Sequence, residues 1–408
     1  MAHRQKFIIN SYGLLCALII GAILGGFYLL QGWLIDVVWP GPTFRPVFNA
    51  VWIAVVGAVI YLTQRTTGQF PKALGLIRAD LAATGTSSYR YLPLQMLVPA
   101  LMLTSGTSLG PEATLVSSTC LFGIWLGDKL RYLEHNWAAI HQQGLGRLLR
   151  ILITPHHYLL RRFPTAKHKS LWTLRMISFF ACGILSFYLT CKWGGEPSVI
   201  VYLGHFAWRM RDLLWLPPIV LSAWLAGRIY LRLMVGVRHI ITNCFTHDWS
   251  LLVFGGLAIY LATLFVPSIN FSGMHNFHLL ATSWQQKPGT FLLVRSFLKL
   301  GLLTICLNTG WLGGDIFPVL FASTAQGIAL SHLLPHLDPI FVIAVCAISM
   351  GATILESPLV AGGVMATMFL PPEMLPICML TTGCIFLVDR GYQRLNGKYG
   401  DQFAILRL

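Results

Sequence analysis

Long apolar stretches constrain the fold of this chain more than any other feature of its sequence. Charged residues make up only 11% of the 408 residues, whereas soluble domains carry about a quarter. A helix needs about 20 apolar residues to cross the hydrocarbon core of a bilayer. We therefore predict an all-α polytopic membrane protein, whose candidate helices are Ile8–Trp39, Val47–Leu62, Leu171–Leu189, Leu213–Leu231, Leu251–Val266, Phe291–Leu307, Ile316–Leu334, Ile340–Ile354 and Met374–Val388.

Glycine or proline interrupts many of these stretches, and some are short. This pattern predicts tilted, broken and half-spanning helices rather than a regular bundle. The first stretch lacks a small-residue cleavage site after a short core, so we expect a retained helix and not a signal peptide. Few residues follow the last stretch, and we therefore expect a single transmembrane domain over residues 1–408 with no soluble regulatory domain.

The positive charge of the chain is concentrated in one segment. The formal net charge is +15, and nine basic residues lie between Lys129 and Arg175. The positive-inside rule predicts a basic cytoplasmic loop over residues 129–170 and cytoplasmic termini. In a membrane protein such a segment orients the chain and attracts anionic lipid headgroups, so we expect membrane lipid as a partner and no nucleic acid.

The cysteines and histidines do not form a metal or catalytic pattern. The nine cysteines are scattered, mostly in apolar stretches, and no Cys-x-x-Cys occurs. We interpret them as small buried hydrophobic residues. Five histidines lie in the basic segment, and no His-Glu-x-x-His occurs. We therefore expect neither a metal nor another cofactor.

Two glycine-rich segments repeat at half the chain length. A shift of 204 residues places Gly106 on Gly310, Gly110 on Gly314 and Gly123 on Gly327. In each segment, Pro or Asp follows the glycines, and we expect a helix of about half a membrane thickness to begin there. The shift predicts a two-fold repeat, with halves at about 8–205 and 206–395. Transporters built from repeats bind their substrate at the repeat interface, with broken helices.

Glu112 stands at the start of the first of these helices. A helix that begins inside the membrane leaves its first N–H groups unpaired, and these favour a negative charge. Glu112 supplies such a charge in the first half, whereas at the matching position of the second half the amides of Ile316 and Phe317 are free to face a passing anion. A carboxylate at membrane depth is a functional hypothesis by default. Glu112 is accordingly predicted to gate an anion path or to carry a proton, with a first-turn acid that only complements the helix dipole as the alternative.

Three other acidic residues lie in apolar or small-residue surroundings. Asp315 precedes Ile-Phe-Pro and suits a helix cap as well as a functional role. Glu356 precedes Ser-Pro, and we expect it at a water-exposed helix start. Asp36 lies near the end of its apolar stretch, where we expect an interfacial position.

The motifs around these residues resemble those of one transporter family. Gly106-x-Ser108-Leu-Gly110-Pro-Glu112 is similar to the glutamate-bearing helix start of the CLC chloride channel and proton/chloride exchanger family. Gly313-Gly-Asp-Ile-Phe-Pro318 and the segment Ala352–Ala361 resemble two later helix starts of that family. The resemblance implies a CLC-like inverted-repeat fold and a homodimer.

Residue by residue, the resemblance implies the following site. Glu112 matches the gating glutamate, and the amides near Gly110, Ile316 and Phe317 match groups that contact the anion. Tyr392, or alternatively Tyr399, matches the tyrosine whose hydroxyl faces the central anion. The serine-bearing segment of the family appears here as Thr66-Thr-Gly-Gln-Phe-Pro71, with Thr67 or the backbone of Gly68 in its place.

Several departures from the family pattern bear on function. The missing serine leaves chloride or fluoride open as the anion, because fluoride-exporting relatives also lack it. Pro111 precedes the glutamate and Ala113 follows it, which alters how freely its side chain swings. No proton-relay glutamate is recognisable between Trp125 and Leu171, where Glu134 is the only glutamate.

We conclude from the sequence that this is a CLC-like anion channel or anion/proton antiporter of a bacterial cytoplasmic membrane, and not an enzyme. A fluoride/proton exporter is the first alternative, and a non-conducting member of the family is another. An intramembrane enzyme is a third, because Gly106-Thr-Ser108-Leu-Gly110 has the Gly-x-Ser-x-Gly spacing of a nucleophile elbow. That motif requires a strand before the serine and a helix directly after it, whereas Gly-Pro-Glu follows here.

Overall fold

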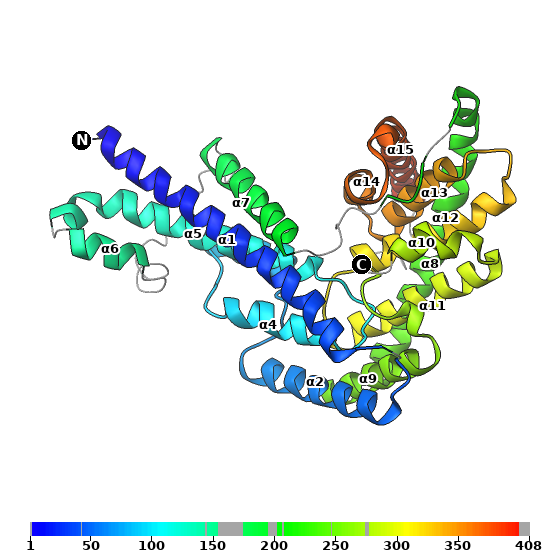
Figure 1. Ribbon diagram of the computed structural model, residues 1–408, viewed down its shortest axis with the longest axis horizontal. Helices are drawn as coiled ribbons and strands as arrows, with labels where there is room; N and C mark the ends of the chain where they lie inside the picture. Colours follow the sequence, from blue (N-terminus) through cyan, green and yellow to red (C-terminus); the bar gives the residue numbers. More distant parts are fainter. Residues whose placement is uncertain are drawn as a thin grey trace. The chain divides into compact units, whose positions relative to one another are not determined.

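A computed structural model of the chain shows a helical protein (Figure 1). The structure describes residues 2–41, 43–142, 145–153, 174–194, 202–205, 208–245, 247–273 and 277–399. All nine predicted apolar helices are present in it. Eight helices of the described part are long and apolar enough to cross a membrane, which confirms the polytopic all-α prediction.

The contacts of the chain divide it into two compact units. The first unit comprises Met1–Val37, Thr67–Ala100 and Ala113–Pro197, and the second comprises Val38–Thr66, Leu101–Glu112 and Ser198–Leu408. The predicted halves 8–205 and 206–395 concern repetition in the sequence rather than compactness, and they stay a prediction.

The helices of the first unit pack through small residues. In Figure 1, α1 and α7 run side by side, and a Cβ atom on Gly21 would lie only 2.1 Å from the carbonyl oxygen of Gly183. Gly21 and Gly25 therefore let two helix backbones approach closely, as small residues do in membrane helices. The unit contains α1 (Ala2–Val38), α3 (Leu74–Thr84), most of α4 (Leu92–Leu103) and α5 (Glu112–Gln142), α6 (Leu145–Ile153) and α7 (Leu174–Trp193).

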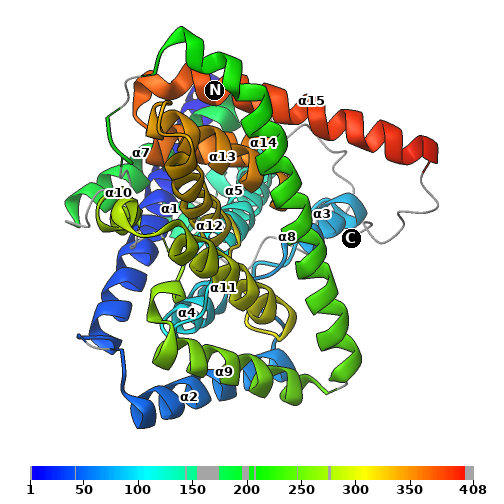
Figure 2. The same cartoon turned by 90° about the vertical axis from the view of Figure 1, so that its right-hand side faces the viewer.

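The second unit is built around two almost fully buried helices, α12 and α13, which pack on each other and on α8 and α11 (Figure 2). The side chain of Asp338 caps α13 by accepting a hydrogen bond from the backbone N–H of Phe341. The α-helices of this unit are α2 (Pro46–Thr66), α8 (Leu216–Cys244), α9 (Asp248–Phe265), α10 (Phe277–Ala281), α11 (Gly289–Asn308), α12 (Ile316–Leu333), α13 (Pro339–Ile354), α14 (Pro358–Val364) and α15 (Leu375–Tyr399). Short 3-10 or π turns connect them: η1 (Met210–Trp215), η2 (Pro267–Ile269), η3 (Ser283–Gln286), η4 (Met365–Phe369) and η5 (Pro372–Met374).

The structure corrects the prediction for the basic segment and for the length of the first repeated helix. We predicted a half-membrane helix after Glu112 and a loop over residues 129–170. Instead, α5 continues for 31 residues from Glu112 to Gln142, and α6 follows. No proline interrupts this stretch, and polar residues beyond Asp128 are compatible with a helix. Residues 154–173, the rest of the predicted loop, lie outside the described part.

The two repeated turns have matching backbone conformations. Gly106 has φ +87° and Gly310 has φ +85°, a region that glycine adopts without steric cost. The helices after these turns begin at Glu112 and Ile316, again 204 residues apart. The glycine repeat therefore reflects repeated structure.

We predict that Gly310→Ala destabilises the protein by about 1–3 kcal/mol, because alanine is strained at this φ and its Cβ would lie 3.2 Å from the Leu252 side chain. Gly301→Ala is the matched control, since Gly301 is helical and nothing lies within 4 Å of its Cβ position. The thermal unfolding midpoint in detergent should fall for the first variant and stay level or rise for the second. Equal midpoints would contradict the role of the turn.

Candidate functional site

The carboxylate of Glu112 is bound at the N-terminus of α12. The backbone N–H of Phe317 donates a hydrogen bond to Oε1 of Glu112 across 2.8 Å, and the amide of Ile316 also interacts with the carboxylate. Phe317 is the second residue of an 18-residue helix, whose first N–H groups have no acceptor within the helix and carry the positive end of its dipole. Negative charge is therefore stabilised at this position.

Two glycines, paired by backbone hydrogen bonds, lie directly against the carboxylate. Gly110 and Gly314 exchange two backbone hydrogen bonds of 2.8 Å, each donating its N–H to the other's carbonyl. A Cβ atom on Gly110 would lie 1.8 Å from Oε2 of Glu112, and one on Gly314 would lie 2.2 Å from its Cδ. The space taken by the glutamate side chain thus exists only because both residues lack a side chain.

The second carboxylate oxygen of Glu112 differs from the first. Oε2 is buried and has no hydrogen-bond partner in the part of the chain that the structure describes, and the whole residue is only 7% exposed. A buried acceptor without a partner is costly, whereas a proton added at Oε2 would remove the charge. The two oxygens of Glu112 are therefore held differently, Oε1 by the N-terminus of α12 and Oε2 by no described group.

Aromatic and hydroxyl side chains hold the turn before Glu112 in place. The indole N–H of Trp39 donates to the carbonyl oxygen of Thr104 (2.7 Å), and that of Trp52 donates to the hydroxyl of Thr104 (3.2 Å). The hydroxyl of Ser108 is fully buried and donates to the carbonyl of Lys299 (3.3 Å). No strand precedes Ser108 in the described segment around it, so the geometry lacks the strand that a nucleophile elbow requires.

Lys299 is a residue of this region that the sequence analysis did not select. Its side chain is fully buried on α11, and Nζ donates to the carbonyls of Ile269 (3.0 Å) and Phe271 (2.9 Å). The ammonium also lies 5.0 Å from the ring centroid of Phe321, a cation–π distance, and its charge interacts with that of Glu112. A single lysine inside the apolar stretch Phe291–Leu307 was the signal that could have found it.

The structure brings together four of the seven predicted site residues: Gly110, Glu112, Ile316 and Phe317. Thr67 and Gly68 lie in the turn after α2, where Gly68 has φ +113°. They belong to the first unit, and their part in an anion site stays a prediction.

Tyr392 lies on α15 and contacts α8 instead. Its ring is 5.4 Å from that of Trp224, and the guanidinium of Arg228 lies 4.5 Å from the ring centroid. Both Trp224 and Arg228 also bond to Asp389. The described contacts of Tyr392 thus join two helices, and its predicted role toward an anion is untested; for Tyr399, the alternative, the structure describes only the backbone.

The remaining acidic candidates occupy less buried positions. Asp315 is exposed and is the N-cap residue of α12, but its side chain forms no cap hydrogen bond. Glu356 is exposed in the turn before α14, and Asp36 is exposed near the end of α1. The water-exposed position expected for Glu356 and the interfacial position expected for Asp36 stay predictions.

The family comparison decides what this chain is related to. The family described as "Voltage gated chloride channel" matches residues 163–390, more than half of the chain. The chain belongs to this family. The match begins after Glu112, so the role of that residue depends on the geometry above and on the local motif.

Individual relatives share low sequence identity with this chain. A protein called "Putative ion-transport protein YfeO" from Shigella flexneri is 23% identical over 298 residues, which cover 72% of this chain and 69% of the relative. The same protein from Escherichia coli strain SE11 matches with the same identity and coverage.

Solved structures show the same fold. A CLC-type fluoride/proton antiporter superposes with a TM-score of 0.67 at 17% identity, covering 95% of this chain and 97% of the other. A slow cyanobacterial Cl−/H+ antiporter also has a TM-score of 0.67, at 16% identity and with coverage of 92% and 93%. The CLC-like fold and the family prediction are confirmed, and with them the expected function at the level of an anion channel or anion/proton antiporter.

We predict that Gly314→Ala and Glu112→Ala are strongly coupled in stability. In the presence of Glu112 the new methyl group collides with the carboxylate, so Gly314→Ala should be clearly destabilising, whereas in the Glu112→Ala background the same substitution should cost less by about 1–3 kcal/mol. Unfolding midpoints of the wild type, the two single variants and the double variant measure this coupling. Additive effects would show that the carboxylate does not lie over Gly314.

Proposed function

We propose that this protein moves small anions across the membrane through a path in which the carboxylate of Glu112 occupies an anion-binding position. The observation that carries the proposal is the hydrogen bond from the N–H of Phe317 to Oε1 of Glu112. The N–H groups that hold the carboxylate are the same kind of group that binds a free anion at a helix N-terminus. Glu112 and a transported anion therefore compete for the start of α12.

The competition explains how one side chain controls the path. With the carboxylate bound, the side chain of Glu112 occupies both the start of α12 and the space over the paired glycines. If the side chain swings away, the N–H groups of Ile316 and Phe317 become available to a dehydrated anion, with the buried charge of Lys299 adding a positive potential nearby. Thr67, Gly68 and Tyr392 are proposed as further contacts along the path.

Protons act on the same group. Protonation of Glu112 removes the negative charge that the α12 N-terminus attracts, and so weakens the hold of the helix on the side chain. A low pH then favours movement of the Glu112 side chain away from the start of α12 and entry of the transported anion. Anion flux is expected to increase as the pH falls, and in an antiporter the proton on Glu112 is the one exchanged for the anion.

We predict that wild-type flux of the preferred anion from proteoliposomes rises on acidification, by up to about tenfold per pH unit while the carboxylate is mainly ionised. Glu112→Gln removes the titrating group and should leave a flux that changes little with pH. Glu356→Gln is the matched control, because Glu356 is an exposed acid in a turn and should keep the wild-type pH profile. A Glu112→Gln profile that follows the wild type would refute the gating role.

A specific observation supports fluoride as a second candidate substrate. The segment Thr66-Thr-Gly-Gln-Phe-Pro71 has no serine, and the similar structures include a CLC-type fluoride/proton antiporter. Fluoride is small and strongly hydrated, so backbone N–H groups such as that of Gly68 would have to replace its water.

We predict that a comparison of anions separates the two substrates. If the protein exports fluoride, efflux from fluoride-loaded liposomes should exceed chloride efflux at least about tenfold, a difference of about 1.4 kcal/mol in selectivity. A pH-sensitive dye inside the liposomes should report proton entry during export. Chloride efflux equal to or faster than fluoride efflux would contradict the fluoride assignment and leave chloride as the substrate.

The proposal also covers the membrane in which the protein lies, the side of its termini and its oligomeric state. A bacterial cytoplasmic membrane is supported by the relatives in Shigella flexneri and Escherichia coli. Cytoplasmic termini are supported by Lys6 and the basic segment that ends near Arg175. A homodimer is expected from the family resemblance.

A further inference from the structure

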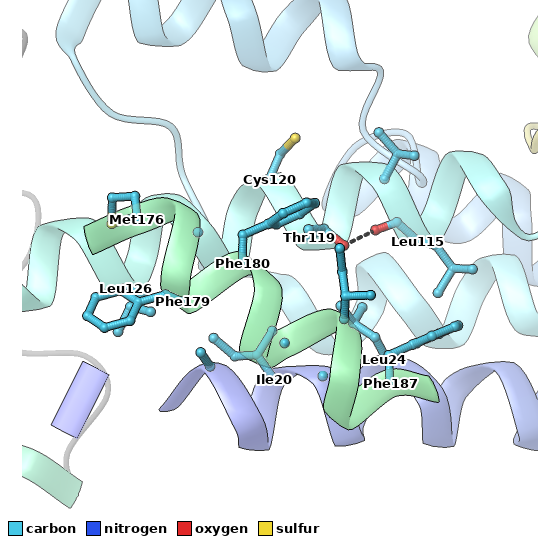
Figure 3. Close-up of a pocket in the computed structure, with 16 residues that line it drawn as sticks. Ile20, Leu24, Leu115, Thr119, Cys120, Leu126, Met176, Phe179, Phe180 and Phe187 are labelled. Carbon is cyan, nitrogen blue, oxygen red and sulfur yellow. Dashed lines mark hydrogen bonds between the residues drawn. The ribbon is translucent and has the colours of Figure 1, made fainter. Parts of the chain in front are cut away.

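An apolar groove runs between α1, α5 and α7 of the first unit (Figure 3). It has a volume of about 480 Å³, and its lining is aliphatic and aromatic apart from Thr119 and Cys120. Ile20 and Leu24 of α1 lie on one side, Leu115 and Leu126 of α5 lie on another, and phenylalanines of α7 lie between them. A groove of this size that stayed empty would forfeit van der Waals contacts along its whole length.

The repeat explains why the groove exists. The shift of 204 residues relates α5, α1 and α7 to α12, α8 and α15 of the second unit, and there α13 packs against all three. The residues that correspond to α13 are 135–150, and the described ones among them belong to the end of α5 and to α6. None of these described residues lines the groove, so no described counterpart of α13 fills this position.

A pair of matched glycines makes the same point at single-residue level. Gly327 of α12 lies against α13, where a Cβ atom would come within 3.0 Å of the backbone of Ile343. Its counterpart Gly123 lines the groove, and nothing lies within 4 Å of its Cβ position. The groove thus lies at the position where α13 packs in the second unit, and no described residue contacts Gly123 there.

An arginine with unused hydrogen-bond donors stands beside the groove. Arg175 donates to Glu134 through Nη1, but its Nε and Nη2 are buried and have no partner among the described residues. Its guanidinium lies 5.6 Å from the ring centroid of Phe179, which lines the groove next to Met176. Glu134 itself is about half exposed, so water screens its charge.

Arginine uses such paired N–H groups for phosphate and carboxylate oxygens. Arg175 also closes a segment that contains nine basic residues from Lys129 onward, and basic sites between membrane helices bind anionic headgroups. An apolar groove with a cationic end matches one class of molecule that every membrane supplies, a phospholipid with an acyl chain and a charged phosphate.

We propose that this groove binds an acyl chain of an anionic phospholipid whose phosphate is held by Arg175. The acyl chain takes the place that α13 has in the second unit, and the headgroup phosphate bonds to the guanidinium of Arg175. Glu112 is not among the lining residues, and occupancy of the groove does not depend on which anion the protein transports.

The test is lipid binding to the purified full-length protein in detergent, measured by native mass spectrometry during titration with phosphatidylglycerol or phosphatidylcholine. Gly123→Leu fills the groove, and Arg175→Gln removes the headgroup contact. The matched controls are Gly127→Leu, since Gly127 is a glycine of the same helix with nothing near its Cβ position, and Arg131→Gln, since Arg131 pairs with Asp128. Unfolding midpoints and elution volumes show whether each variant is folded.

The wild type should bind phosphatidylglycerol more tightly than phosphatidylcholine. Gly123→Leu should weaken binding of both lipids. Arg175→Gln should weaken phosphatidylglycerol binding by about fivefold and phosphatidylcholine binding less, because the choline cation of the latter already neutralises its phosphate. Binding should be unchanged in both controls. The two tested variants act through different contacts, so either one tests the proposal if the other does not fold.

Three results would overturn the proposal. In the first, both lipids bind with equal affinity and Arg175→Gln has no effect. In the second, Gly123→Leu binds lipid as the wild type does. In the third, Gly123→Leu instead changes the elution volume to that of a different oligomer, which would make a second copy of the chain the occupant. Anion flux that depends on Glu112 could persist in all three cases, so failure here is distinct from failure of the proposed transport.

Discussion

The reciprocal hydrogen bonds between Gly110 and Gly314 are the contact on which the site depends. Two turns from distant parts of the chain meet there, and each satisfies a backbone donor and acceptor of the other, which buried backbone requires. The pairing sets the starts of α5 and α12 beside each other, so the side chain of one reaches the free amides of the other. Because both residues lack a Cβ atom, the acid lies over the pair and not beside it.

Two tryptophans near this pair fix the backbone of the first turn, and a buried lysine adds a positive charge. Trp39 and Trp52 fix the carbonyl and hydroxyl of Thr104 ahead of the first turn. Lys299 is buried on α11. Its charge is compensated by the carbonyls of Ile269 and Phe271 and by the ring of Phe321, and not by a carboxylate. A permanent ion pair with Glu112 would hold the acid in one state, whereas a lysine bound to neutral groups leaves the acid free to bind a proton.

The sequence was sufficient for the features that depend on composition and local pattern. The apolar stretches predicted the helices, and the glycine repeat predicted two equivalent turns and the place of Glu112 at a helix start. It was insufficient where tertiary contacts decide. The length of α5 was missed because charged residues after Asp128 indicate a loop by hydropathy but are equally compatible with a helix. Lys299 was missed because one lysine in an apolar run does not reveal the carbonyls that receive it. The contacts of Tyr392 with Trp224 and Arg228 could not be foreseen, because they join helices that are far apart in the chain.

The difference between Gly123 and Gly327 has a historical consequence. Two halves that share a spacing of 204 residues descend most simply from one duplicated segment, and both copies would then have begun with a glycine that received a neighbouring helix. Gly327 has such a neighbour, whereas no described residue lies within 4 Å of the Cβ position of Gly123. Close packing against another helix then requires glycine at position 327 and no longer requires it at position 123. A larger residue at position 123 would be accommodated unless another molecule lies against it.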